Sequence, residues 1–273
     1  RVSITDFRKM SERQIRFIEE SIWSDKPIQM SSGSVRSGKN FAGIFRLSMF
    51  LANEPYGYET SDFAFCGAST KAVYRIILKD LFALIGKDNY TYNRQDGSGR
   101  IFDRDFYSFG FCKANSVEPL RGMTLGGLAG TEAIFCHEEF FDESNLRLSL
   151  PGSKSFWDTN PGSPNHYLKR FLDDPEKQSQ VEHHEFLLKD NTYYLEQNPD
   201  YIKKLYVMYP PGTLLHKRMI LGQWAMAEGI IFDSIDSGNK ITRDQLPANF
   251  DSYQVGVDYG TQNACVFLLI GIK

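Results

Sequence analysis

The sequence predicts an α/β fold in which a mostly parallel β-sheet lies between two layers of helices. Three observations support this prediction. Apolar, strand-like runs alternate with helical runs across residues 26–172, which is typical of parallel strands joined by helices. A glycine-rich segment at residues 33–39 stands between one such strand and the next helix. The composition, 41% hydrophobic and 24% charged residues, is that of an ordinary globular protein.

The elements follow from local patterns. Apolar residues have helical spacing over residues 10–24, and Ser11 can cap the N-terminus of that helix. A hairpin tip is predicted at residues 95–100, between two aromatic-rich strands. The other expected elements are, in chain order, strand 26–32, helix 40–54, strand 62–69, helix 70–86, strand and turn 125–135, helix 137–148, strand, turn and helix within 154–172, helices 198–209 and 211–224, and a β-hairpin over 253–272.

A polar, turn-rich stretch marks a boundary between two domains. We expect one domain over residues 1–228, whose last part, from about residue 191, is a small helical subdomain. Residues 229–250 are then a linker, and residues 251–273 begin a new sheet. The chain starts at Arg1 without a methionine and ends just after an apolar strand, so we expect it to be part of a longer protein.

Charge and hydropathy narrow the functional classes. The net charge is −3 and the isoelectric point is near 6.0, so no global basic field indicates nucleic-acid binding, although a local basic patch remains compatible with it. No apolar run reaches the roughly 18 residues that a membrane span needs. The four cysteines form no C-x-x-C pair, and we expect reduced thiols.

The segment "GSVRSGKN" at residues 33–40 fits the phosphate-binding pattern G-x-x-x-x-G-K-[ST] except at its last position. Loops of this kind direct backbone N–H groups at phosphates, and the following helix adds its positive end. Asn40 stands where a hydroxyl normally binds Mg²⁺, and its amide oxygen can replace that ligand. An inactive nucleotide site and an ordinary glycine turn are the alternatives. The residues expected to bind nucleotide are Gly33, Ser34, Val35, Arg36, Ser37, Gly38, Lys39 and Asn40.

Two acidic residues are candidates for the chemistry. Glu132 ends the strand in "GGLAGTEA" and can orient a water molecule, or it is an isolated strand-end carboxylate. Thr131 occupies the place where an aspartate usually helps to bind the metal ion. Asp158 ends a neighbouring strand and can supply the missing carboxylate, the alternative being a turn-capping role.

Five segments match one known family in the same order and span nearly the whole chain. They are "SERQIRFI" (11–18), "GSVRSGKNFA" (33–42), the run from "PLRG" to "KRFL" (119–172), "LLHKRMILGQWAMAEGIIFDSI" (214–235) and "VGVDYG" (255–260). They resemble segments of the large subunit of phage terminases, the ATP-driven motors that pump double-stranded DNA into procapsids. The resemblance implies a P-loop NTPase domain with a helical lid subdomain, followed by the first hairpin of an RNase H-like nuclease domain.

The resemblance also implies roles for individual residues. It places Gln14 beside the adenine and assigns the catalytic glutamate to Glu132, which acts with Arg36 of the loop. Two arginines, Arg121 and Arg147, are candidates for an arginine finger between subunits, or else are surface or salt-bridge residues. The resemblance assigns the coupling of hydrolysis to movement to the segment Thr159, Asn160 and Pro161.

ATP and Mg²⁺ are the implied cofactors, with Asn40 and Asp158 as tentative metal ligands. The implied partners are DNA, a portal protein and a small terminase subunit, in the host cytoplasm and transiently on the procapsid. We expect a ring during packaging; a monomer is the alternative for the isolated chain. The rival functions are a helicase, a small-molecule kinase, and a module that binds nucleotide but hydrolyses it weakly.

Asp258 matches the first metal-binding aspartate of the nuclease domain. No further Asp or Glu follows it in this sequence. Because two-metal cleavage needs several carboxylates, we expect nuclease activity only in the full-length protein.

Overall fold

The structure is a computed structural model that describes residues 10–53, 61–112, 116–226, 242, 245–258 and 266–273. The chain divides into two compact units, Arg1–Ala227 and Glu228–Lys273.

An eight-stranded sheet forms the centre of the first unit, with the strand order β3-β4-β5-β2-β6-β7-β1-β8. The six strands from β5 to β8 in this order are parallel to their neighbours, whereas β3 and β4 join antiparallel at one edge. The prediction of a mostly parallel sheet is therefore confirmed. The strands are β1 (Ile28–Gly33), β2 (Asp62–Gly67), β3 (Tyr90–Tyr92), β4 (Ser98–Ile101), β5 (Arg104–Gly110), β6 (Leu125–Gly130), β7 (Lys154–Thr159) and β8 (Val181–Phe186).

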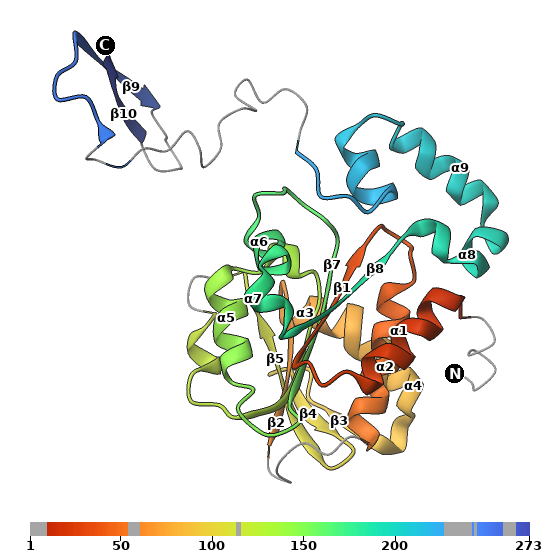
Figure 1. Cartoon of the computed structure of the whole chain (residues 1–273). Coiled ribbons are helices and arrows are strands. Elements are labelled where there is room, and N and C mark those ends of the chain that lie inside the picture. The colour runs from red at the N-terminus through yellow and green to blue at the C-terminus, as the bar shows by residue number, and fades with distance from the viewer. Residues whose placement is uncertain (1–9, 54–60, 113–115, 227–241, 243–244, 259–265) are drawn as a thin grey trace. The chain divides into compact units, whose positions relative to one another are not determined.

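Helices cover both faces of this sheet and complete the three predicted layers. Figure 1 shows α1, α2 and α4 on one face and α5, α6 and α7 on the other. The first group is α1 (Glu12–Trp23), α2 (Lys39–Asn53), α3 (Thr70–Val73), the π-helical turn η2 (Tyr74–Leu78) and α4 (Lys79–Ile85). The second group is α5 (Glu138–Leu146), α6 (Tyr167–Asp173) and α7 (Pro175–Gln178).

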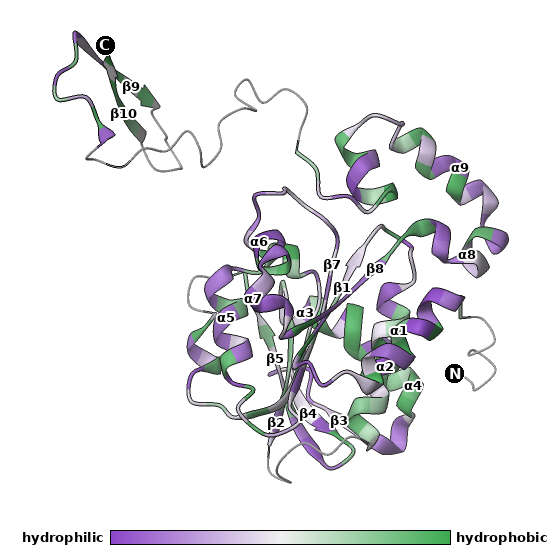
Figure 2. Ribbon diagram, viewed as in Figure 1, coloured by the Kyte–Doolittle hydropathy of each residue, from purple (hydrophilic) through white to green (hydrophobic). Residues whose placement is uncertain are grey.

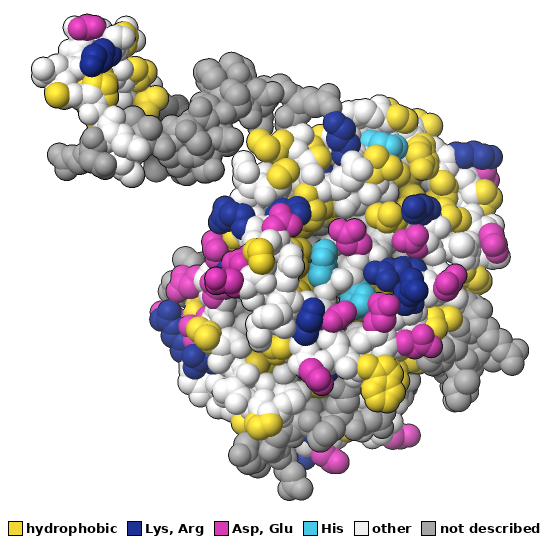
Figure 3. All heavy atoms as spheres, viewed as in Figure 1, with side chains coloured by type: hydrophobic (Ala, Val, Ile, Leu, Met, Phe, Trp, Pro, Cys, Tyr) yellow, Lys and Arg dark blue, Asp and Glu magenta, His cyan; other side chains and the backbone are white. Residues whose placement is uncertain are grey.

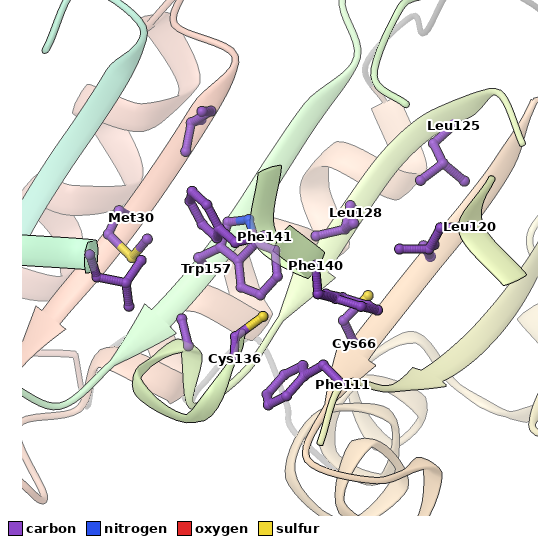
Figure 4. Packing of buried hydrophobic residues seen from close by; sticks show 14 of the residues in the cluster. Met30, Cys66, Phe111, Leu120, Leu125, Leu128, Cys136, Phe140, Phe141 and Trp157 are labelled. Carbon is purple, nitrogen blue, oxygen red and sulfur yellow. The ribbon is translucent and has the colours of Figure 1, made fainter. Parts of the chain in front are cut away.

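The core consists of two main apolar clusters. One contains Leu47, Phe50 and Phe65, and the other contains Met30, Trp157 and further residues shown in Figure 4. In Figure 2 hydrophilic residues mark much of α1 and α5, whereas hydrophobic residues mark α2 and α4. The thiols of Cys66, Cys112 and Cys136 are free, as predicted, while Cys265 lies outside the described residues.

A small helical subdomain, called the lid below, follows β8. It contains α8 (Thr192–Gln197), α9 (Pro199–Met208) and the π-helical turn η7 (His216–Ile220). The predicted helix over residues 211–224 is much shorter than expected, because Gly212 and Gly222 adopt positive φ angles of 88° and 66°. The chain runs on from Gly222 to Met226 without regular secondary structure.

The structure differs from the sequence-based prediction at two further places. The strand β8 was not predicted, because "VEHHEF" is polar and gives no apolar run. The hairpin tip lies at residues 93–97 rather than 95–100, since Ser98 already pairs with Tyr107 in the sheet.

The second unit contains the antiparallel strands β9 (Ser252–Asp258) and β10 (Val266–Ile272). They agree with the predicted β-hairpin. Nothing in this pair alone identifies an RNase H-like domain. In the described residues, no helix combines the length and the apolar character that crossing a membrane requires.

The N-terminus of α1 gives a test of the local fold. The Ser11 hydroxyl accepts a hydrogen bond from the Gln14 backbone, while the Gln14 side chain accepts one from the Ser11 N–H. Ser11→Ala should lower the free energy of unfolding by about 1 kcal/mol, because one helix N–H loses its acceptor. Urea denaturation measures this change. Ser11→Asp retains a capping oxygen, so equal destabilisation by both substitutions would contradict the capping role.

Candidate nucleotide site

The glycine-rich loop connects β1 to α2, as the sequence predicts. Gly33 has a φ of 145°, and a Cβ atom there would lie 1.8 Å from the Phe186 carbonyl oxygen, so only glycine fits. Arg36 and Gly38 also have positive φ angles, 57° and 86°. Such a sequence of conformations turns successive N–H groups toward one concave space.

The backbone donors of this loop fall into two groups. The N–H groups of Ser34 and Val35 donate to the carbonyls of Phe186 and Met219, at 3.0 and 2.9 Å. None of the described residues accepts a hydrogen bond from the N–H groups of residues 36–40. These free donors lie at the N-terminus of a 15-residue helix, where an anion is favoured.

Lys39 is held inside the protein by two oxygen atoms. Its Nζ donates to the Ser34 carbonyl at 3.2 Å and to Asn160 Oδ1 at 2.6 Å. Only 7% of the residue is exposed, and this burial lowers the pKa of the Lys39 ammonium group. The nearby carboxylates of Asp158 and Glu132 oppose that shift. The structure therefore brings together the loop, the two acidic candidates and the segment after β7.

The two carboxylates come from neighbouring strands. Glu132 lies two residues beyond β6 and starts the turn η5 (Ala133–Phe135). Its backbone is left-handed, with φ 56° and ψ 45°, a strained conformation for a non-glycine residue. Asp158 lies near the end of β7, where burial raises the pKa of its carboxyl group. The Lys39 charge opposes that rise.

A cavity of about 950 Å³ contains this arrangement, a size that accommodates a nucleotide. The loop, both carboxylates and Asn160 line one part of it, and lid residues line another. Asn40 lies at the start of α2 and also lines the cavity. Ser34 and Ser37 have buried hydroxyl groups without a hydrogen-bond partner among the described residues.

Arg36 connects the loop to the lid. Its guanidinium lies 6.0 Å from the ring centre of Tyr194 and 5.8 Å from that of Tyr201. A hydrogen bond to Tyr201 raises the pKa of Arg36. The Asn191 side chain donates to the Arg36 carbonyl at 2.9 Å. Arg36 thus stays charged at the cavity wall, but its side chain rests on the lid tyrosines.

Gln14 lies under the loop, with both ends of its amide engaged. Its oxygen accepts the Ser11 N–H at 2.8 Å, and its Nε2 donates to the Gly38 carbonyl at 3.0 Å. Gln14 is 3% exposed. These contacts show a residue that supports the loop; direct binding of adenine by Gln14 stays a prediction.

The remaining predicted residues lie in different places. Arg121 is exposed and pairs with Glu139 at 3.2 Å, whereas Arg147 ends α5 and pairs with Glu143 at 3.0 Å. Neither lines the cavity described above. Asp258 ends β9 in the second unit. The described residues contain no cluster of three His, Cys, Asp or Glu side chains that could bind a metal ion.

Sequence reasoning missed several residues of the cavity wall. Asn191, Tyr194 and Tyr201 reach it from the lid, and Arg75 reaches it from η2. These residues carry no recognisable motif. The spacing of apolar residues over 70–86 does not indicate the π-helical turn that carries Arg75.

No protein-family model matches the chain, and a search of curated proteins finds no match for it. Solved structures do match. The large terminase from the thermophilic bacteriophage D6E aligns with a TM-score of 0.69 and 26% identity, covering 96% of this chain and 65% of that one. The same terminase in complex with ATP-γ-S aligns with a TM-score of 0.65 and 26% identity, covering 96% and 64%. The ATPase domain of the Thermus phage P74-26 large terminase aligns with a TM-score of 0.58 and 14% identity, covering 82% and 99%.

The chain therefore matches phage large terminases structurally over most of its length. The P74-26 comparison, at low identity, shows that the shared part is the fold of the ATPase domain. The chain spans 65% of the length of the D6E terminase.

The position of Gln14 leads to a prediction about nucleotide affinity. Gln14→Ala should weaken the binding of ATP-γ-S about three- to tenfold, because the Gly38 carbonyl loses a hydrogen bond of about 1 kcal/mol. The loss should be the same for GTP-γ-S, since Gln14 supports the loop. Calorimetry with both nucleotides measures the two losses. Gln178→Ala, which removes a comparable bond to the Leu172 carbonyl, is the matched control and should change neither affinity.

A loss confined to ATP-γ-S would contradict the supporting role and would favour contact with adenine.

Proposed function

We propose that this chain is the ATPase domain of a phage large terminase, followed by the start of its nuclease domain, and that it hydrolyses ATP to drive double-stranded DNA into a procapsid. The contact between Lys39 and Asn160 supports this most directly, because it joins the phosphate loop to the segment that the resemblance assigns to coupling. The match to a terminase in complex with ATP-γ-S supports the nature of the ligand.

The residues of the cavity fit in-line attack of water on a γ-phosphate. The free N–H groups of residues 36–40 cradle the phosphates, and Lys39 neutralises negative charge as the transition state forms. Glu132 accepts a hydrogen bond from the attacking water and orients it. Arg36 supplies a second positive charge once it leaves the lid tyrosines for the phosphate.

Asn40 and Asp158 are the proposed ligands of Mg²⁺. Both line cavities beside Lys39, and both offer the oxygen atoms that this ion binds. Thr131, which stands where the family usually has an aspartate, directly follows β6 and lies beside Asp158 of the adjacent strand β7. The carboxylate is therefore on β7 and not at the end of β6. When bound, Mg²⁺ neutralises the charge that develops on the phosphates.

The partners are also proposals. A terminase ATPase domain acts on double-stranded DNA, with a portal protein and a small terminase subunit, as a ring on the procapsid in the host cytoplasm. The pair β9 and β10, with Asp258 at the end of β9, is proposed to begin an RNase H-like domain. The main alternative, a module that holds nucleotide but hydrolyses it weakly, rests on Asn40 and Thr131 at two metal-side positions.

Phosphate release in the presence of Mg²⁺ distinguishes these functions. Lys39→Ala should abolish ATP binding or turnover, because it removes the buried positive charge of the loop that neutralises the transferred phosphoryl group. Glu132→Gln should retain ATP-γ-S binding but slow turnover by about 100-fold or more, the scale of a lost general base. Glu139→Gln, an exposed change on α5, is the control.

Loss of binding in Glu132→Gln would show that this carboxylate is structural, and wild-type turnover in Lys39→Ala would rule out the loop as the site.

The metal assignment has its own test. Asp158→Asn should raise the Mg²⁺ concentration that gives half-maximal turnover by about tenfold or more, since a charged ligand is lost. Asp62→Asn is the matched control, because Asp62 also has a pKa raised by burial but stands at the start of β2, away from the loop. An unchanged Mg²⁺ requirement in Asp158→Asn would leave Asp158 with a structural role only.

A further inference from the structure

The segment Gly222–Met226 leaves the lid and packs against the turn that follows β7. The Ala225 N–H donates to the Gly162 carbonyl at 3.1 Å. Its own carbonyl accepts two hydrogen bonds from the Arg218 guanidinium, at 2.9 and 2.6 Å. We call Gly222–Met226 the exit segment, because it is the last described part of the first unit.

The same turn after β7 also contacts the residues next to Glu132. A Cβ atom at Gly162 would lie 2.6 Å from the Ile134 side chain, so the two are in close contact. The Tyr167 hydroxyl donates to the Ala133 carbonyl at 3.5 Å. The His166 ring lies beside the Ile134 carbonyl. Residues 162–167 therefore contact both the turn η5, which directly follows Glu132, and the exit segment.

Trp224, in the exit segment, packs against the turn after β7. Its ring is stacked with the His166 ring, with centroids 6.4 Å apart and an interplanar angle of 29°. It also packs against the core cluster that contains Trp157 and Phe141. A Cβ atom at Gly162 would lie 3.8 Å from it. His166 is fixed from its other side, because its Nδ1 accepts the Leu168 N–H at 3.2 Å and so caps α6.

We propose that Trp224 is a positioning residue for Glu132, acting through Gly162 and His166, and that this contact joins the state of the ATPase site to the exit segment. The proposal rests on the proposed function. Glu132 has a strained left-handed backbone, which persists only where the surroundings hold it. Displacement of a catalytic group by about 1 Å can reduce a rate by about 100-fold. The packing around η5 is therefore the place where the exit segment can act on hydrolysis.

Steady-state phosphate release by the 273-residue chain tests this role. Trp224→Ala should lower kcat about tenfold or more, while the affinity for ATP-γ-S changes less than about twofold, because the loop is untouched. Trp224→Phe keeps an aromatic ring on His166 and should restore kcat to within about threefold. Phe171→Ala is the matched control, since Phe171 is also a partly buried aromatic residue on the same core and packs there against Phe141.

A second variant changes the packing between the turn after β7 and η5 without removing an aromatic ring. Gly162→Ala places a methyl group against Ile134 and should also lower kcat with unchanged ATP-γ-S affinity. Wild-type kcat in both Trp224→Ala and Gly162→Ala would overturn the proposal. A loss of kcat in Phe171→Ala as large as that in Trp224→Ala would also overturn it, because it would show general destabilisation. A chain that binds no ATP-γ-S or releases no phosphate would instead refute the proposed function.

Discussion

A buried positive charge is the constraint on which the rest of the site depends. Lys39 is 7% exposed and burial lowers the pKa of its ammonium group, so nearby oxygen atoms are needed to stabilise the charge. The loop supplies one through Ser34, the segment after β7 supplies another through Asn160, and β6 and β7 supply two carboxylates nearby. These groups converge because β1, β6 and β7 are parallel neighbours whose carboxyl ends meet at one edge of the sheet.

The lid is joined to this edge through the loop itself. Val35 donates its N–H to Met219 and packs with Leu205, Ile220 and other residues of the lid core, while Arg36 rests on two lid tyrosines. Figure 3 shows hydrophobic side chains gathered over α8 and α9. These contacts are a direct physical connection between the loop and the lid.

Much of the fold could be predicted from the sequence, for reasons visible in single elements. Strong local signals, such as the Ser11 cap and the glycines of the loop, have one structural solution and were interpreted correctly. The strand β8 was missed because its polar residues give no apolar run. The length of the last lid helix was overestimated because the spacing of apolar residues does not show that Gly222 adopts a positive φ angle. At the site, the proximity of Asp158 to Lys39 could be expected because the carboxyl ends of the strands in such a sheet converge. The use of Gln14 as a loop support, and the lid tyrosines around Arg36, depend on tertiary contacts that no motif encodes.

The contacts of Gly33 and Ser34 with β8 have a consequence for a chain that is still being synthesised. Its missing side chain makes room for the Phe186 carbonyl, which also accepts the Ser34 N–H. Residues 34 and 186 are 152 positions apart (186 − 34), so a ribosome has synthesised more than half of the chain before this bond can form. Contacts of such separation are associated with slow folding, because the entropy of closing the intervening loop opposes them. A nascent chain that lacks β8 therefore has neither this hydrogen bond nor the carbonyl group against which Gly33 packs.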